Sequence, residues 1–305
     1  MIVTHESWQH GRFRLPVSWP GFEDTGPIVW PTVVFPREPV VIEQAQSEPV
    51  VADANTVMVY NAMRTYTRRA LTDRGDRCEW YSVTPTLALE IARSLGLPGD
   101  DPRSMAPFAH APCSPRLYRD QRRLSLCMDN ACAEPLALTE MVFDLFRRAL
   151  EPGVGARQRR SAATTEPTRR AHRDLAENAK ALLAQRYAQR LTLDMLSDEL
   201  EVSPFHLART FRHWTGQTVH KYLTALRVAA ALDLIALGVP LGKVATMTGF
   251  SSHSHFTQIF GQMLGESPSA WRRNIQGSGL GSEPCDGFEE DLGTAQACTE
   301  TQDAG

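Results

Sequence analysis

The chain has 305 residues, which suggests about two domains of roughly 150 residues each. Hydrophobic residues make up 42% of the chain and charged residues 22%, so neither a collagen-like nor a wholly disordered protein is expected. No apolar run approaches the ~18 residues that a membrane span needs, and the first residues lack the apolar stretch of a secretory signal. Six cysteines are too few for a disulfide scaffold, so the sequence predicts a cytoplasmic protein with reduced thiols.

The net charge of −3 conceals three segments of different sign. Residues 1–156 contain 16 Lys or Arg and 19 Asp or Glu, residues 157–275 contain 16 and 9, and residues 276–305 contain none and 7. The second segment is therefore positive and the last is negative. Positive charge gathered in one segment favours a polyanionic partner for that segment.

Residues 1–151 are expected to form a β-rich domain that ends in helices. Proline recurs every few residues over the first 50, which excludes long helices and permits short extended segments. β-branched runs predict strands at 33–35, 40–42, 50–51, 56–60 and 78–83. Apolar spacing predicts helices at 86–95 and 136–150. The apolar stripe of the second helix packs within its own domain or forms a dimer interface, and the sequence leaves both interpretations open.

Two segments lack the apolar residues that a packed core requires. Residues 152–171 contain five arginines, two glycines and two prolines, and this composition predicts a basic linker. Residues 275–305 are rich in glycine and acidic side chains, and they predict a disordered acidic tail. The remaining segment, 172–274, is then a second domain.

Residues 172–274 have the pattern of consecutive helices. Thr192, Ser203 and Ser252 are expected N-caps, and Gly216 and Gly265 are expected to end helices. Apolar residues at helical spacing predict helices at 172–187, 193–200, 204–215, 218–237, 241–247 and 252–264. The domain is therefore expected to be entirely α-helical.

This helical segment contains an internal repeat with an offset of 49 residues. The matching pairs are Ser203/Ser252, His206/His255, Leu207/Phe256, Phe211/Phe260, Gly216/Gly265 and Tyr222/Trp271. Each copy is a short helix, a turn and a longer serine-capped helix, which is the helix-turn-helix pattern. In such units the second helix enters the major groove of DNA. The sequence therefore predicts two DNA-binding units in tandem.

Residues 172–274 resemble the DNA-binding domain of the AraC/XylS family of bacterial transcription regulators. The resemblance rests on SPFHLARTFRHWTGQTVHKYLTALRVAAALDLI at 203–235 and VATMTGFSSHSHFTQIFGQMLGESPSAWRR at 244–273. It implies seven helices, with the long helix at 218–237 holding two recognition helices about one turn of DNA, ~34 Å, apart. For residues 1–151 it implies a cupin-like β-barrel plus helices that senses an effector or dimerises. The expected fold class is α+β.

The resemblance implies DNA contacts from both recognition helices. Arg209 is the strongest candidate for base readout, because arginine can donate two hydrogen bonds to guanine, and a phosphate contact alone is the alternative. Gln258 is a candidate reader of adenine. Ser203 is expected to cap its helix and touch phosphate. The full expected set is Ser203, Phe205, Ala208, Arg209, Arg212, Ser252, His253, Ser254, Thr257 and Gln258.

Two positions depart from the common family pattern. Gln258 stands where many relatives have arginine, which removes a positive charge from the second unit. Glu201 stands where relatives often have glycine, in a turn that can require a positive φ, at a cost on the order of 1 kcal/mol. His253 and His255 lie two residues apart on a helix and point in different directions, so no metal pair is expected there.

From this resemblance we expect a sequence-specific transcription regulator with no catalytic residues, metal or cofactor. Its expected partners are double-stranded DNA and RNA polymerase, while a small-molecule effector and a homodimer stay open. An activator is favoured, and the alternative is a ligand-independent repressor or a regulator whose N-terminal domain only dimerises.

Rival chemistry finds little support in the sequence. A metal-dependent cupin enzyme needs clustered histidines, but residues 1–156 contain only His5, His10 and His110. Zinc binding is disfavoured because Cys113, Cys127 and Cys132 lack the spacing of a zinc knuckle. Cys78 is expected to be a packed cysteine, and a thiol sensor is the alternative.

Overall fold

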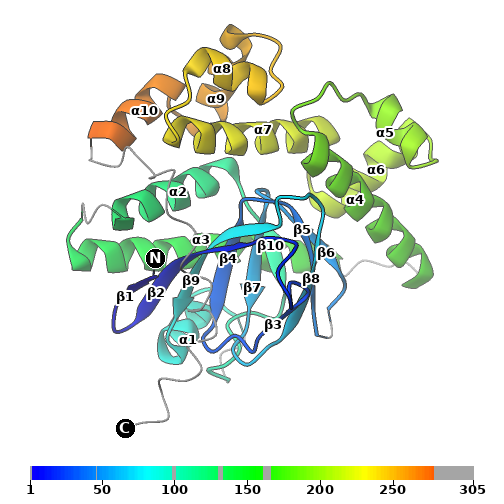
Figure 1. Ribbon diagram of the computed structural model, residues 1–305. Coiled ribbons are helices and arrows are strands. Elements are labelled where there is room, and N and C mark those ends of the chain that lie inside the picture. The colour runs from blue at the N-terminus through cyan, green and yellow to red at the C-terminus, as the bar shows by residue number, and fades with distance from the viewer. Residues whose placement is uncertain (1, 46, 98–100, 130–132, 161–165, 278–305) are drawn as a thin grey trace.

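The structure, a computed structural model, describes residues 2–45, 47–97, 101–129, 133–160 and 166–277 (Figure 1). The N-terminal part, residues 2–160, holds two β-sheets and the helices α1 to α3, and the C-terminal part, residues 166–277, holds only helices. Helix α2 lies between the sheets and α7. The predicted α+β fold class is confirmed.

All strand pairs of the two sheets are antiparallel, with strand orders β1-β2-β9-β4-β7-β10 and β3-β8-β5-β6. The strands are β1 (Ile2–Thr4), β2 (Trp8–Leu15), β3 (Asp24–Thr25), β4 (Thr32–Pro36), β5 (Val40–Gln44), β6 (Val50–Ala52), β7 (Thr56–Tyr60), β8 (Tyr66–Ala70), β9 (Asp76–Val83) and β10 (His110–Pro112). The five predicted strands are all present. The sequence analysis missed the other five strands. Three of them, β1, β3 and β10, have only two or three residues, and in β2 and β8 arginines and other polar residues interrupt the apolar pattern.

The two sheets pack face to face around an apolar cluster to which both contribute. This cluster includes Ile42 and Ala52 from the smaller sheet and Met58 and Tyr60 from the larger one. No ladder joins the sheets over the residues that the structure describes, so the expectation of a closed barrel is wrong. The physical reason lies at the edges of the smaller sheet, where β3 and β6 have only two and three residues and offer few groups for further pairing.

The helices of the N-terminal part are α1 (Pro85–Ser94), α2 (Pro115–Asp129) and α3 (Pro135–Arg160). Helix α1 corresponds to the predicted helix at 86–95, and α3 contains the predicted helix at 136–150. The inner face of α3, with Leu145 and Phe146, is buried in the main core, so its stripe packs within its own part. Leu136 and Phe143 stay exposed on the other face. The dimer interface therefore stays a hypothesis for that second face.

Helix α2 was not predicted, and its environment explains why. Its segment contains four arginines, and its buried residues include the polar Gln121, Arg122 and Ser125. One side contacts the larger sheet, where the hydroxyl of Tyr81 donates to the carbonyl of Gln121 (3.3 Å). The other side packs against α7 and α9. Sequence analysis looks for apolar residues at helical spacing, and the polar residues on the buried sides of α2 hide that spacing.

The predicted linker at 152–171 is wrong for most of its length. Helix α3 continues through Pro152 to Arg160, and α4 begins at Glu166. Glycine and proline suggested a loop, but Gly153 packs so closely on Phe108 that a Cβ at this position would lie 2.4 Å from that ring. Residues 161–165 lie outside the described residues.

The C-terminal part consists of seven helices over its described residues, as the family resemblance implied. They are α4 (Glu166–Arg186), α5 (Leu193–Glu199), α6 (Pro204–Thr215), α7 (Val219–Ala236), α8 (Leu241–Met247), α9 (His253–Leu264) and α10 (Pro268–Gly277). Helix α10 runs to residue 277, past the predicted start of the tail at 275. The rest of the predicted acidic tail, 278–305, lies outside the described residues.

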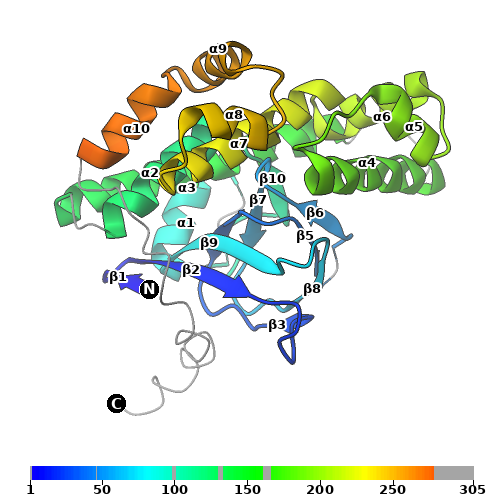
Figure 2. The same cartoon turned by 45° about the horizontal axis from the view of Figure 1, so that its top comes forward.

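Helix α7 is buried on more than one side. Leu237, at the end of the predicted helix 218–237, is 42% exposed, whereas Val228, Leu232 and Ile235 are buried. The helix is covered by the N-terminal part on one side and by other C-terminal helices on the other (Figure 2). A single core cluster accordingly runs from Trp8 to Ile275.

The cysteines differ partly from expectation. Cys127 is disulfide-bonded, so the prediction of reduced thiols is wrong at this position, and Cys127 offers no thiolate to zinc. Cys78 and Cys113 are free and buried. Burial raises the pKa of the Cys78 thiol well above its usual value, which disfavours a reactive thiolate and therefore a thiol sensor.

Over the described residues, no helix has the length and apolar character needed to cross a bilayer.

Candidate nucleic-acid interface

The first helix-turn-helix unit consists of α5 and α6. The Thr192 hydroxyl accepts a hydrogen bond from the Met195 amide (3.2 Å), and the Ser203 hydroxyl accepts one from the His206 amide (3.2 Å). Gly216 ends α6 with φ +76°. These caps satisfy backbone groups at both ends of α6, so local sequence alone fixes where this recognition helix begins and stops.

The predicted DNA-contacting residues of α6 lie on one face, away from the core. Leu207 and Phe211 anchor the helix inward. Phe205 is 76% exposed, and Arg209 and Arg212 are exposed. With Ala208, they line a hollow of about 820 Å³ between α5, α6 and the start of α7. A concave surface that carries two free-standing cations suits a phosphate backbone and base edges.

The second unit, α8 and α9, repeats this construction. The Ser252 hydroxyl accepts from the His255 amide (3.1 Å), and Gly265 ends α9 with φ +81°. The predicted contact residues His253, Ser254 and Gln258 are exposed. Thr257 differs from them, because its hydroxyl oxygen is buried and does not face solvent. Three of the four predicted contact residues of α9 therefore lie on its exposed face, and Thr257 is the exception.

Both turns have a positive backbone angle. Glu201 adopts φ +54° in the first unit, as the comparison with family glycines suggested. At the matching turn of the second unit, Gly249 has φ +76°, and a Cβ there would lie 2.6 Å from the carbonyl oxygen of Ala188. The second turn therefore requires glycine for space as well as for φ, whereas the first accepts a side chain at a modest strain.

The two recognition helices differ in charge. Helix α6 contains Arg209 and Arg212, whereas α9 contains no lysine or arginine. Since phosphate neutralisation supplies much of DNA affinity, the first unit is the better electrostatic anchor.

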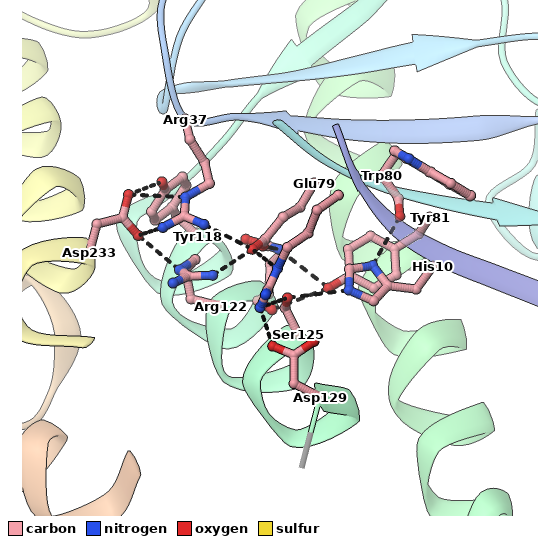
Figure 3. Close-up of polar contacts among 12 residues, drawn as sticks. His10, Arg37, Glu79, Trp80, Tyr81, Tyr118, Arg122, Ser125, Asp129 and Asp233 are labelled. Atoms are coloured by element: carbon pink, nitrogen blue, oxygen red, sulfur yellow. Dashed lines mark hydrogen bonds and ion pairs between the residues drawn. The ribbon is translucent and has the colours of Figure 1, made fainter. Parts of the chain in front are cut away.

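A cluster of buried charged residues that the sequence analysis missed joins the two parts of the chain (Figure 3). We call it the interdomain ion cluster, and it comprises Arg37, Glu79, Arg122 and Asp233. Arg37 and Arg122 each pair with two carboxylates. One belongs to Glu79 on the larger sheet, and the other belongs to Asp233 on α7. Burial alone raises the pKa of Glu79, but Arg122, Arg37 and Arg12 outweigh it and hold that pKa far below its usual value. No sequence motif indicated this cluster, because Arg37 and Asp233 are 196 residues apart.

Two further sets of polar contacts tie the C-terminal part to the N-terminal part. At the start of α7, the Tyr222 hydroxyl donates to the buried Asp53 carboxylate (2.7 Å), and the Asn55 amide donates to the Tyr222 carbonyl (3.1 Å). The second set of contacts joins arginines of α2 to the end of α9. Arg123 pairs with Glu266 (2.8 Å), and Arg119 donates to the carbonyl of Leu264. The N-terminal part thus contacts the start of α7 and the end of the second helix-turn-helix unit.

His10 lies beside the interdomain ion cluster and predicts a pH dependence. Its Nδ1 donates to the Trp80 carbonyl (3.0 Å), and its Nε2 contacts the Ser125 hydroxyl (3.2 Å). Burial lowers the pKa of His10 from 6.5 to about 4. As the pH falls, the His10 imidazole is therefore protonated in the unfolded chain at a higher pH than in the folded chain. We expect His10 to destabilise the fold progressively between pH 6.5 and 4, by about 3 kcal/mol in total.

The measurement is urea unfolding of the wild type and His10→Gln at pH 7 and pH 4.5. The variant should lose less stability than the wild type over this interval, because glutamine does not titrate. Equal losses in the two proteins would show that His10 does not carry the effect.

Comparison with known proteins places residues 196–274 in a helix-turn-helix domain family. The chain is 32% identical over 88 residues to the bifunctional transcriptional activator/DNA repair enzyme AdaA of Bacillus subtilis, covering 28% of this chain and 42% of AdaA. It is 30% identical over 117 residues to the transcriptional activator RhaR of Klebsiella pneumoniae, covering 38% and 42%. The transcriptional regulator Rob of Salmonella typhimurium is 30% identical over 97 residues, covering 32% and 34%.

Solved structures give weaker similarities. The DNA-binding domain of AdpA in complex with a target DNA is 27% identical, covers 34% of this chain and 93% of that chain, and has a TM-score of 0.32. Unsaturated fatty acid-bound ToxT of Vibrio cholerae is 14% identical, covers 90% and 97%, and has a TM-score of 0.34.

The double helix-turn-helix geometry and the matched sequence define the class. The C-terminal part is a DNA-binding domain of the helix-turn-helix type. Through this domain the chain is similar to regulators of the AraC/XylS family. The chain matches less than half the length of these curated relatives.

Proposed function

We propose that the protein is a sequence-specific transcription regulator that binds double-stranded DNA through α6 and α9, and that it works in the cytoplasm without being an enzyme. The observation that carries this proposal is the pair of serine-capped helices, each anchored inward by phenylalanines and each with polar side chains outward. The curated relatives named above as activators and regulators support it. An activator that also contacts RNA polymerase is the form we favour.

The test is selection of bound sequences from a random DNA library by the full chain, followed by footprinting on the selected site. We expect one preferred sequence with protection on one face of the duplex over two successive major grooves. Equal affinity for selected and random DNA at fixed salt would identify a non-specific binder instead.

Replacing Arg209 by alanine should weaken binding to the selected site by about 1–3 kcal/mol and relax the preference at one base pair, because a two-bond contact to guanine is lost. The measurement is a titration of selected DNA and of single-base variants at one salt concentration. Lys243→Ala, which removes a cation from α8 rather than from a recognition helix, is the control. A loss that is equal on every sequence would assign Arg209 to phosphate instead of bases.

An enzymatic N-terminal part is the second candidate, since AdaA is named as a bifunctional activator and repair enzyme. His10 does not favour a metal centre, because both its ring nitrogens already have protein partners.

The exposed face of α3 is our candidate for a homodimer contact. Analytical ultracentrifugation of the wild type and Phe143→Glu would test it.

A further inference from the structure

The Asp233 carboxylate lies in a site built by the N-terminal part. Arg37 donates from Nη2 to Oδ1 (3.0 Å) and from Nε to Oδ2 (3.3 Å), so one guanidinium spans both oxygens. Arg122 Nε lies 2.8 Å from Oδ1, and the Tyr118 hydroxyl donates to Oδ2 (3.2 Å). Three side chains, one from the residue after β4 and two from α2, thus converge on one carboxylate, as Figure 3 shows.

The two arginines of this site have a second partner besides Asp233. The side chains of Arg37 and Arg122 are 3% and 1% exposed in the folded chain, and both also pair with Glu79, which is fully buried. Side chains that are held in this way lose little conformational freedom when they bind an anion. A guanidinium that faces both oxygens is the arrangement that matches a planar carboxylate.

Charge also favours an anion at this site. Arg12, Arg37 and Arg122 all reach Glu79, and Arg12 also pairs with Asp129. Around Glu79 the N-terminal part therefore presents three arginines and two carboxylates, those of Glu79 and Asp129, and Asp233 from α7 supplies a third carboxylate. Arg37 and Arg122 hold the pKa of Asp233 below its usual value although burial raises it.

We propose that Arg37, Arg122 and Tyr118 form a carboxylate-binding site, that Asp233 is its occupant within the chain, and that a free small carboxylate takes the same site. The Asp233 carboxylate occupies the position between the two arginines, so a ligand bound there and the docking of α7 at Asp233 exclude each other. Such a ligand binds two arrangements of the protein with different affinity, which is the requirement for a regulatory effector. The inference concerns the N-terminal part and does not depend on DNA binding.

The experiment removes the internal occupant and supplies acetate. Full-length Asp233→Ala is melted in sodium acetate, sodium chloride and sodium phosphate at equal pH and ionic strength. We expect acetate, at roughly ten times its Kd, to raise the Tm of the variant by about 2–4 °C over chloride. The wild type should show no such difference. The control is Asp144→Ala, which removes an aspartate from between Arg147 and Arg148 on the exposed face of α3 and should not respond to acetate.

Asp233→Asn provides a second arm, because the amide keeps the volume of the carboxylate and removes its charge. It should respond to acetate less than Asp233→Ala. If Asp233→Ala does not fold in chloride, the same comparison is made on refolding yield in acetate and in chloride. The proposal is overturned if acetate has no effect beyond that of chloride on Asp233→Ala, or if phosphate exceeds acetate, since that would assign a different anion class.

Discussion

Replacing Glu79 by glutamine is expected to lower the free energy of unfolding by about 3–5 kcal/mol at pH 7, because it leaves buried guanidinium groups without their shared anion. Glu79 is fully buried and pairs with Arg12, Arg37 and Arg122. Glutamine keeps the shape of the side chain and removes only the charge. Urea unfolding of the full chain, followed by circular dichroism, measures the loss.

The matched control for this experiment is Glu140→Gln. Glu140 is exposed on α3, and the same change there should alter the free energy of unfolding by no more than about 0.5 kcal/mol. A loss below about 1 kcal/mol in Glu79→Gln would show that the interdomain ion cluster does not depend on its central carboxylate.

Inserting five base pairs between the two halves of the selected DNA site should weaken binding roughly 100-fold or more, because about half a helical turn moves the second half to the opposite face. Helix α7 has 18 residues, a length of about 27 Å, and it is packed along its length. The second unit therefore cannot follow the displaced half-site. Competition binding on otherwise identical duplexes measures the change.

Substituting the intervening bases without changing their number is the control, and it should alter affinity little. An insertion of ten base pairs restores the face but lengthens the distance by about 34 Å, so a rigid pair of units should not recover. Unchanged affinity on the five-base-pair insertion would mean that one unit alone reads the site.

Local sequence determined the two helix-turn-helix units almost completely. Thr192, Ser203 and Ser252 cap the helices that follow them, and Gly216 and Gly265 end the recognition helices in the left-handed conformation. These are interactions between residues a few positions apart, so a short stretch of sequence contains both partners. The outward position of Arg209 and Gln258 then follows from the inward position of the apolar residues.

The tertiary structure alone decided how the two parts meet. Helix α2 contains four arginines and buries polar residues such as Gln121, because the larger sheet covers one side and α7 and α9 cover the other. The interdomain ion cluster unites Arg37, Arg122 and Asp233 from three distant segments, and no spacing along the chain encodes that meeting. Burying these charges costs free energy unless each finds an opposite charge, and only the packed fold provides those partners.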